Sequence, residues 1–158
     1  MEAERLNQWL NLAATLGVIA GIAFLIVELD QTNRIARYTA EIGWRSQAIE
    51  INSSRIEYSE TYAKLQADEA ELSPSERAQA LMMARQLFNF WINAESAYDL
   101  GLISDRSFES TLIDISVSLE EAPGLVPSFA YLLDAYKMDN ETSIVTKRVA
   151  DIVRGADN

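Results

Sequence analysis

Any chemistry of this sequence would have to rest on carboxylates, hydroxyls, Lys or Arg, because it contains 24 Asp and Glu residues but no His and no Cys. The lack of both removes thiolate nucleophiles, His-based proton relays and zinc sites of the usual ligand type. A partly buried Glu95 beside Tyr98 would be a candidate acid, although a carboxylate in such a place is more often paired with an Arg or a Tyr. No di-iron site is expected, since that motif requires Glu-x-x-His.

Two further polar clusters fall short of a recognisable site. Asp139-Asn140-Glu141 offers oxygen ligands but not the twelve-residue loop with a central Gly that a calcium-binding hand requires. Glu28 and Asp30 follow a long apolar segment, where carboxylates either line an ion path or, more often, are solvated. We also find no phosphate-binding loop and no nucleophile elbow. The sequence therefore predicts no catalytic residue, no metal ligand and no bound cofactor.

The charge is distributed unevenly along the chain. The formal net charge is −11. Residues 1–45 have a net charge of −1, whereas residues 46–158 hold 19 acidic and 9 basic side chains, a net charge of −10. Such a domain repels phosphate backbones, so we expect no nucleic-acid partner.

An apolar segment near the N-terminus is long enough to cross a membrane. Leu6 to Val27 is a run of 22 uncharged residues, and as a helix it would rise roughly 33 Å, close to the thickness of the hydrocarbon layer. We interpret it as a single span. A buried core helix would normally show a polar stripe, whereas only Thr15 is polar from Leu12 to Val27. A cleaved signal peptide is disfavoured because "MEAER" is not a basic leader. Only Arg5 precedes the segment, whereas Arg34, Arg37 and Arg45 follow it. This bias predicts an outside N-terminus and a cytoplasmic C-terminal domain.

Small residues recur along this segment at a spacing that suits helix packing in lipid. Ala13, Gly17 and Gly21 are four residues apart, so they form one groove on a helix. Helices in lipid associate by close packing, which such a groove permits. The alternative is that Gly and Ala are simply common in spans. We predict a helix-packing interface at Ala13, Gly17 and Gly21, with either a second copy or another membrane-protein subunit.

The predicted helix over residues 31–66, which continues the span, has two apolar faces. One consists of isoleucines seven residues apart, namely Ile35, Ile42, Ile49 and Ile56. The other, about 180° away, contains Trp44, Ala48, Ile51, Tyr58, Tyr62 and Leu65. A surface helix needs only one apolar face. We expect this helix to lie between two helices of its own domain, which we favour, or between its domain and a partner subunit, for which the isoleucines would be the partner face.

Capping signals mark further helices. In "LSPSER", Ser73, Pro74 and Glu76 occupy the N-cap, N1 and N3 positions of a capping box. Gly101 is placed to end that helix, and Ser104 to begin the next. The expected helices cover residues 74–100, 105–121, 127–137 and 141–154. We therefore predict an all-α fold, with the tail and transmembrane helix in residues 1–30 and an acidic cytoplasmic bundle of about five helices in residues 31–158.

The residues after the apolar segment resemble a bacterial family. "ELDQTN" is similar to the "EIxQNT" signature that follows the span in a group of bacterial single-pass membrane proteins of uncharacterised function. "LSPSERAQ" and "FWINAESAYDLGLIS" are also similar to downstream segments of that group. The resemblance covers residues 9–136, although Thr32-Asn33 inverts the usual Asn-Thr order. It implies a single-pass architecture in a bacterial inner membrane, and it implies no activity for any residue.

These features together favour a non-catalytic interaction protein. We expect a membrane-anchored homo-oligomeric scaffold or an accessory subunit of a larger membrane complex. A homo-oligomeric pore built on the small-residue face is the alternative, and a carboxylate-based enzyme is a more distant one.

Overall fold

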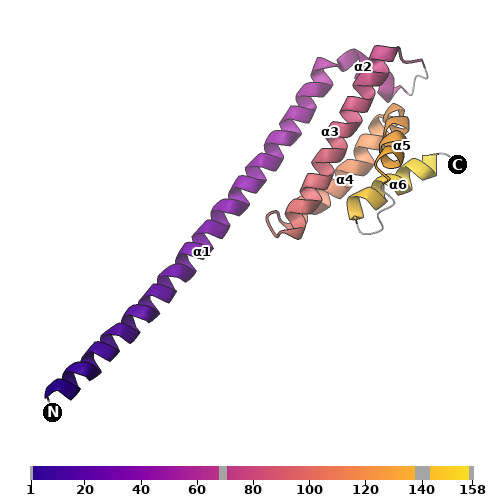
Figure 1. Ribbon diagram of the computed structural model, residues 1–158. Coiled ribbons are helices and arrows are strands. Elements are labelled where there is room, and N and C mark those ends of the chain that lie inside the picture. The colour runs from indigo at the N-terminus through magenta and orange to yellow at the C-terminus, as the bar shows by residue number, and fades with distance from the viewer. Residues whose placement is uncertain (1, 68–70, 138–142, 157–158) are drawn as a thin grey trace. The chain divides into compact units, whose positions relative to one another are not determined.

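The chain is almost entirely helical in the computed structural model, which describes residues 2–67, 71–137 and 143–156 (Figure 1). These residues contain no strand, so the predicted all-α class is confirmed. The elements are α1 (Glu2–Glu57), α2 (Ser59–Gln66), α3 (Pro74–Asp99), α4 (Asp105–Glu121), the short 3-10 helix η1 (Pro123–Leu125), α5 (Val126–Ala135) and α6 (Ile144–Ala156).

The chain divides into two compact units, Met1–Thr39 and Ala40–Asn158. The first unit is helical throughout its described residues and contains the apolar segment. Within the described residues, α1 is the one helix long and apolar enough to cross a membrane, and none of its most apolar window is buried by the rest of the chain. Thr15, the polar residue in the middle of this segment, donates from Oγ1 to the carbonyl oxygen of Asn11 at 2.8 Å. This bond satisfies its hydroxyl within the helix.

The long helix differs from its predicted extent at the C-terminal end. Helix α1 runs without interruption through Gly43 and Ser53 and ends at Glu57. The single helix expected over residues 31–66 is interrupted at Tyr58, whose φ of −107° and ψ of 36° are not helical. The chain then enters the short helix α2. No Gly or Pro marks this break, which explains why the sequence pattern did not indicate it.

The predicted helix boundaries around α3 are confirmed. Ser73 is the N-cap, and its capping box with Glu76 is present. At the other end Gly101 has a φ of +66°, a conformation that an L side chain rarely adopts. The N–H groups of Gly101 and Leu102 donate to the carbonyl oxygens of Tyr98 and Ala97, each at 2.8 Å. This is the hydrogen-bond pattern of a Schellman motif, which satisfies the last carbonyls of the helix.

Aromatic rings form the centre of the second unit. Trp91 of α3 and Phe129 of α5 have no exposed surface and stack with their ring centroids 5.4 Å apart. Phe88 meets Phe129 edge-on at 6.2 Å. Helices α4 and α6 complete this core with Ile115, Leu119, Val145 and Val149.

One backbone approach is close enough to require glycine. A Cβ atom at Gly124 in η1 would lie 2.9 Å from the Cα atom of Leu65 in α2. Leu65 itself is 1% exposed. Since the obstructing atoms belong to a backbone, they cannot rotate away. Gly124 therefore allows α2 to pack directly on the loop before α5.

Candidate functional site

The small-residue positions lie on α1 in the first unit, where nothing described in the chain covers them. Ala13, Gly17 and Gly21 are all exposed. A Cβ atom added at Gly17 or Gly21 would meet nothing within 4 Å. The glycines are therefore not required by contacts within the chain itself. Packing of another helix on this groove stays a prediction.

The isoleucine face is also exposed. Ile42, Ile49 and Ile56 in the second unit are 49%, 68% and 77% exposed, and Ile35 in the first unit is 57% exposed. The opposite side of α1 packs against the core of the second unit through residues that include Trp44, Ala48 and Ile51. The favoured prediction, a helix between two others of its own domain, is therefore wrong for the described residues. The domain covers one side of α1 only.

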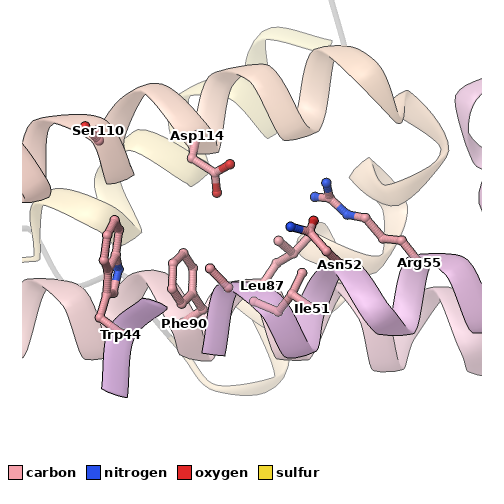
Figure 2. A pocket seen from close by; sticks show the side chains of 9 residues that line it. Trp44, Ile51, Asn52, Arg55, Leu87, Phe90, Ser110 and Asp114 are labelled. Carbon is pink, nitrogen blue, oxygen red and sulfur yellow. The ribbon is translucent and has the colours of Figure 1, made fainter. Parts of the chain in front are cut away.

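A pocket of about 260 Å³ opens between α1, α3 and α4, entirely within the second unit (Figure 2). Its lining is mostly apolar, with polar side chains from α1 and α4. The residues are Trp44, Ala48, Ile51, Asn52 and Arg55 of α1, Leu87 and Phe90 of α3, and Ser110 and Asp114 of α4.

Groups of opposite charge line this pocket at different places. The Asp114 carboxylate accepts a hydrogen bond from Nε1 of Trp91 at 2.7 Å. The Arg55 guanidinium donates to Oγ of Ser118 at 3.1 Å and lies 5.3 Å above the ring centroid of Tyr62. Figure 2 shows Arg55 at one end of the pocket and Asp114 projecting from α4 between the ends. The two charged groups form no ion pair with each other among the described contacts.

The other end of the pocket is an aromatic wall with an unused donor. Trp44 stacks on Phe90 with ring centroids 5.7 Å apart and an interplanar angle of 16°. Its Nε1 atom is buried and has no hydrogen-bond partner among the described residues. Buried donors without a partner are rare in folded proteins and cost stability. The Trp44 ring thus lines the pocket, while its buried N–H has no partner among the described residues.

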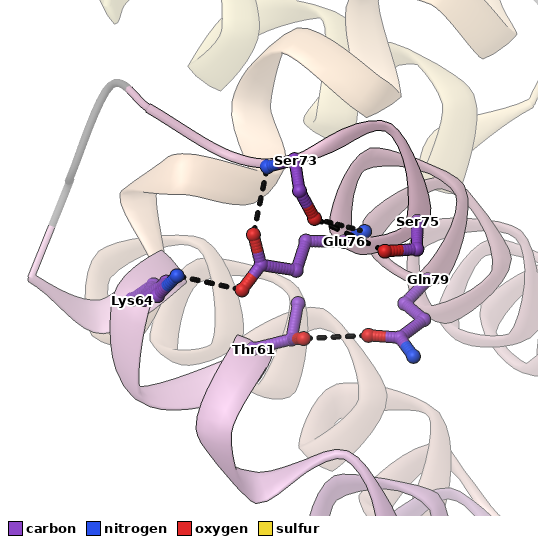
Figure 3. A network of polar contacts seen from close by, with 6 residues as sticks. All are labelled: Thr61, Lys64, Ser73, Ser75, Glu76 and Gln79. Carbon is purple, nitrogen blue, oxygen red and sulfur yellow. Dashed lines mark hydrogen bonds and ion pairs between the residues drawn. The ribbon is translucent and has the colours of Figure 1, made fainter.

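A second polar cluster joins α2 to the start of α3 (Figure 3). Glu76 accepts from the Ser73 backbone N–H at 2.7 Å and from Nζ of Lys64 at 2.6 Å. Nearby, Thr61 donates to Oε1 of Gln79 at 2.5 Å. The Lys64–Glu76 and Thr61–Gln79 contacts join α2 to α3, and the bond from Ser73 caps α3. None of these residues lines the pocket between α1, α3 and α4. We assign the cluster a structural role.

The pH dependence of stability should report on Glu76. The hydrogen bond from Lys64, followed by that from the Ser73 backbone, lowers the pKa of Glu76 from 4.5 to about 2. A lowered folded-state pKa stabilises the fold above pH 4.5, and this contribution is lost as the pH falls towards 2. We expect Glu76→Gln to lower the melting temperature above pH 4.5 and to match the unmodified chain near pH 2. Thermal unfolding at several pH values measures this, with exposed Glu120→Gln as the control; a pH-independent difference would contradict it.

No family model, curated protein or solved structure matches the chain. The resemblance to the bacterial membrane group stays a prediction.

The buried side chain of Glu95 caps the start of α6. Glu95 is 8% exposed. It accepts hydrogen bonds from Oγ of Ser143 and from the backbone N–H of Ile144, both at 2.6 Å. The predicted Arg or Tyr partner is therefore wrong. The free N–H groups at the start of α6 attract a carboxylate instead. Asp139-Asn140-Glu141, the other oxygen-ligand cluster, lies outside the described residues.

Three pocket groups were not singled out by the sequence as a site. Arg55 and Asp114 lie 59 positions apart, and no motif links them. The sequence did place Trp44 on a packing face of its helix, but burial of its N–H without a partner depends on how α3 and α4 pack. Only the fold brings these groups to one pocket.

Proposed function

We propose that this chain is a membrane-anchored, non-catalytic interaction protein that binds another subunit through the isoleucine face of α1. The observation that carries the proposal is the exposure of Ile42, Ile49 and Ile56 on a helix whose opposite side packs on its own domain. Single exposed apolar residues are common on protein surfaces, whereas a row of them along one helix is typical of an interface.

The spacing of this row favours a second copy as the partner. A repeat of seven residues is the spacing at which helices meet along a seam, and in parallel coiled coils isoleucine at the a position favours two strands when Leu occupies d. Copies anchored in one membrane by their N-terminal helices would run parallel. The positions three residues after the isoleucines include Tyr38, Arg45 and Asn52. Because these are mostly polar, the proposed contact is a single row of isoleucines rather than a full coiled coil.

The anchor is the proposed role of Leu6 to Val27. The exposure of this apolar segment supports the role, since water would solvate it poorly. The Lys and Arg bias and the resemblance lead us to propose a bacterial inner membrane. The N-terminus would lie outside, and an acidic bundle of about five helices would lie in the cytoplasm.

We expect Ile49→Glu to dissociate the assembly that the full chain forms in a gentle detergent. Ile49 is 68% exposed in the single chain, so a glutamate is tolerated by the monomer, whereas an interface would have to bury its charge. Burying one Ile contributes about 1.5–3 kcal/mol, so association should weaken at least about tenfold. Light scattering measures the mass, and mass spectrometry identifies any other subunit that co-purifies.

Ile113→Glu is the matched control for this test. Ile113 on α4 is 60% exposed and belongs to no proposed interface, so its replacement should leave the assembled mass unchanged. A monomer that brings down no other subunit, or an assembly that survives Ile49→Glu, would overturn the proposed interaction face. Release of the protein by alkaline carbonate would overturn the membrane anchor.

A further inference from the structure

We propose that the pocket between α1, α3 and α4 binds a free α-amino acid with a linear apolar side chain, of the methionine type. This site is separate from the isoleucine face and does not depend on the proposed interaction. Its volume of about 260 Å³ equals the space of roughly nine waters at about 30 Å³ each, and it is smaller than most drug-sized sites. A pocket of that size suits a small metabolite.

The charged groups indicate a zwitterion. Arg55 and Asp114 line the same pocket without pairing. Among the described residues the guanidinium has one hydrogen-bond partner, Ser118, and the carboxylate has one, Trp91. A guanidinium has five N–H donors and a carboxylate about four acceptor positions. Both groups therefore have hydrogen-bonding capacity to offer a ligand.

The spacing of these groups matches the head of an amino acid. Asp114 and Ser118, which holds Arg55, are four residues apart on α4, which is about 6 Å along the helix. An ammonium and a carboxylate joined through one carbon, with a hydrogen bond of about 2.8 Å at each end, can span that distance. We place the ammonium at Asp114 and the carboxylate at Arg55.

The net charge of the domain favours this ligand over an anion. Residues 46–158 carry a net charge of −10, which repels a negatively charged molecule at long range. A zwitterion has no net charge and avoids this repulsion. It also offers each charged group of the pocket a partner of the opposite sign.

The rest of the pocket suits a linear apolar side chain. Ile51, Leu87 and Phe90 provide apolar walls. Trp44 and Arg55 are eleven residues apart on α1, about 16 Å along the helix, so a side chain must extend away from the charged head to approach Trp44. A thioether packs well on aromatic rings, which Trp44 and Phe90 provide in the wall of this pocket.

The test measures binding of L-methionine to the full chain in detergent by calorimetry. Two analogues each remove one charge: L-methioninol lacks the carboxylate, and 4-(methylthio)butanoate lacks the ammonium. We expect L-methionine to bind at least about tenfold more tightly than either, because a hydrogen bond to a charged group is lost in each case.

Variants assign each charge to its partner. Arg55→Gln should weaken L-methionine about tenfold or more and leave L-methioninol unchanged. Asp114→Asn should weaken L-methionine similarly and leave 4-(methylthio)butanoate unchanged. Arg85→Gln and Asp134→Asn, on exposed surfaces outside the pocket, are the matched controls. This crossed pattern separates lost recognition from simple loss of folding.

Several outcomes would overturn the proposal. No binding of L-methionine below about 10 mM would mean that the pocket does not recognise this type of ligand. Equal binding of L-methionine and 4-(methylthio)butanoate would indicate a site for anions instead. A loss of L-methionine binding in the control variants would show that the ligand binds elsewhere.

Discussion

Phe129→Ala is expected to lower the free energy of unfolding of the second unit by about 3–5 kcal/mol. Phe129 has no exposed surface, stacks on Trp91 at 5.4 Å and meets the edge of Phe88 at 6.2 Å. Removing the ring loses these contacts and leaves a cavity that helices on all sides cannot close. Denaturant titration followed by near-ultraviolet circular dichroism, which reports on packed aromatic rings, measures the change.

Tyr131→Ala on the same helix is the control for this loss. Tyr131 is two residues away in the sequence and is 58% exposed, so its removal should change the free energy of unfolding by no more than about 0.5 kcal/mol. The pair keeps helix and residue class constant and changes only burial. Equal effects of the two substitutions would contradict the position of Phe129 at the centre of the core.

Gly17→Leu combined with Gly21→Leu is expected to remove most of the association that occurs within the membrane. In the single chain a Cβ at either position meets nothing within 4 Å, so the added side chains fit the monomer. Where another helix packs on the groove, two leucines would separate the backbones by several ångströms, and packing contacts are short-ranged. Membrane insertion should persist, because Leu is more favourable in lipid than Gly. Crosslinking in membranes and co-purification in gentle detergent measure the loss.

Val18→Leu and Ile22→Leu provide the comparison for the glycine pair. Both residues are also exposed, at 62% and 54%, but they lie one position further along the helix and face another direction. These substitutions should leave association intact. If the glycine double variant also does so, the groove faces lipid and the glycines reflect ordinary span composition.

Local signals account for the parts of the fold that the sequence predicted. The Ser73 capping box and the stop at Gly101 depend on residues within a few positions of each other. Periodicity likewise placed Trp44, Ala48 and Ile51 on one apolar face of their helix, and this face packs on the core. The all-α class and most helix boundaries after residue 73 follow from such signals, because helix formation and capping are decided within a few turns.

Features that depend on distant residues were missed or wrongly assigned. Periodicity revealed two apolar faces on α1, but it did not reveal that the domain covers only the Trp44 side. The partner of Glu95 is Ser143, which lies 48 positions away. The pocket groups Arg55 and Asp114 have no sequence relationship at all. In each case the missing information is which helices pack against which, and a single sequence does not contain it locally.

The place of α6 after the helices it covers has a consequence for biosynthesis. Val145 and Val149 of α6 have no exposed surface, and Glu95 of α3 bonds to its first turn. Because a ribosome adds about 5–20 residues per second, α3, α4 and α5 are synthesised before the helix that packs on them. The apolar surfaces that α6 covers are accessible to water and to chaperones during that interval. The order of synthesis thus delays closure of this core until α6 has been made.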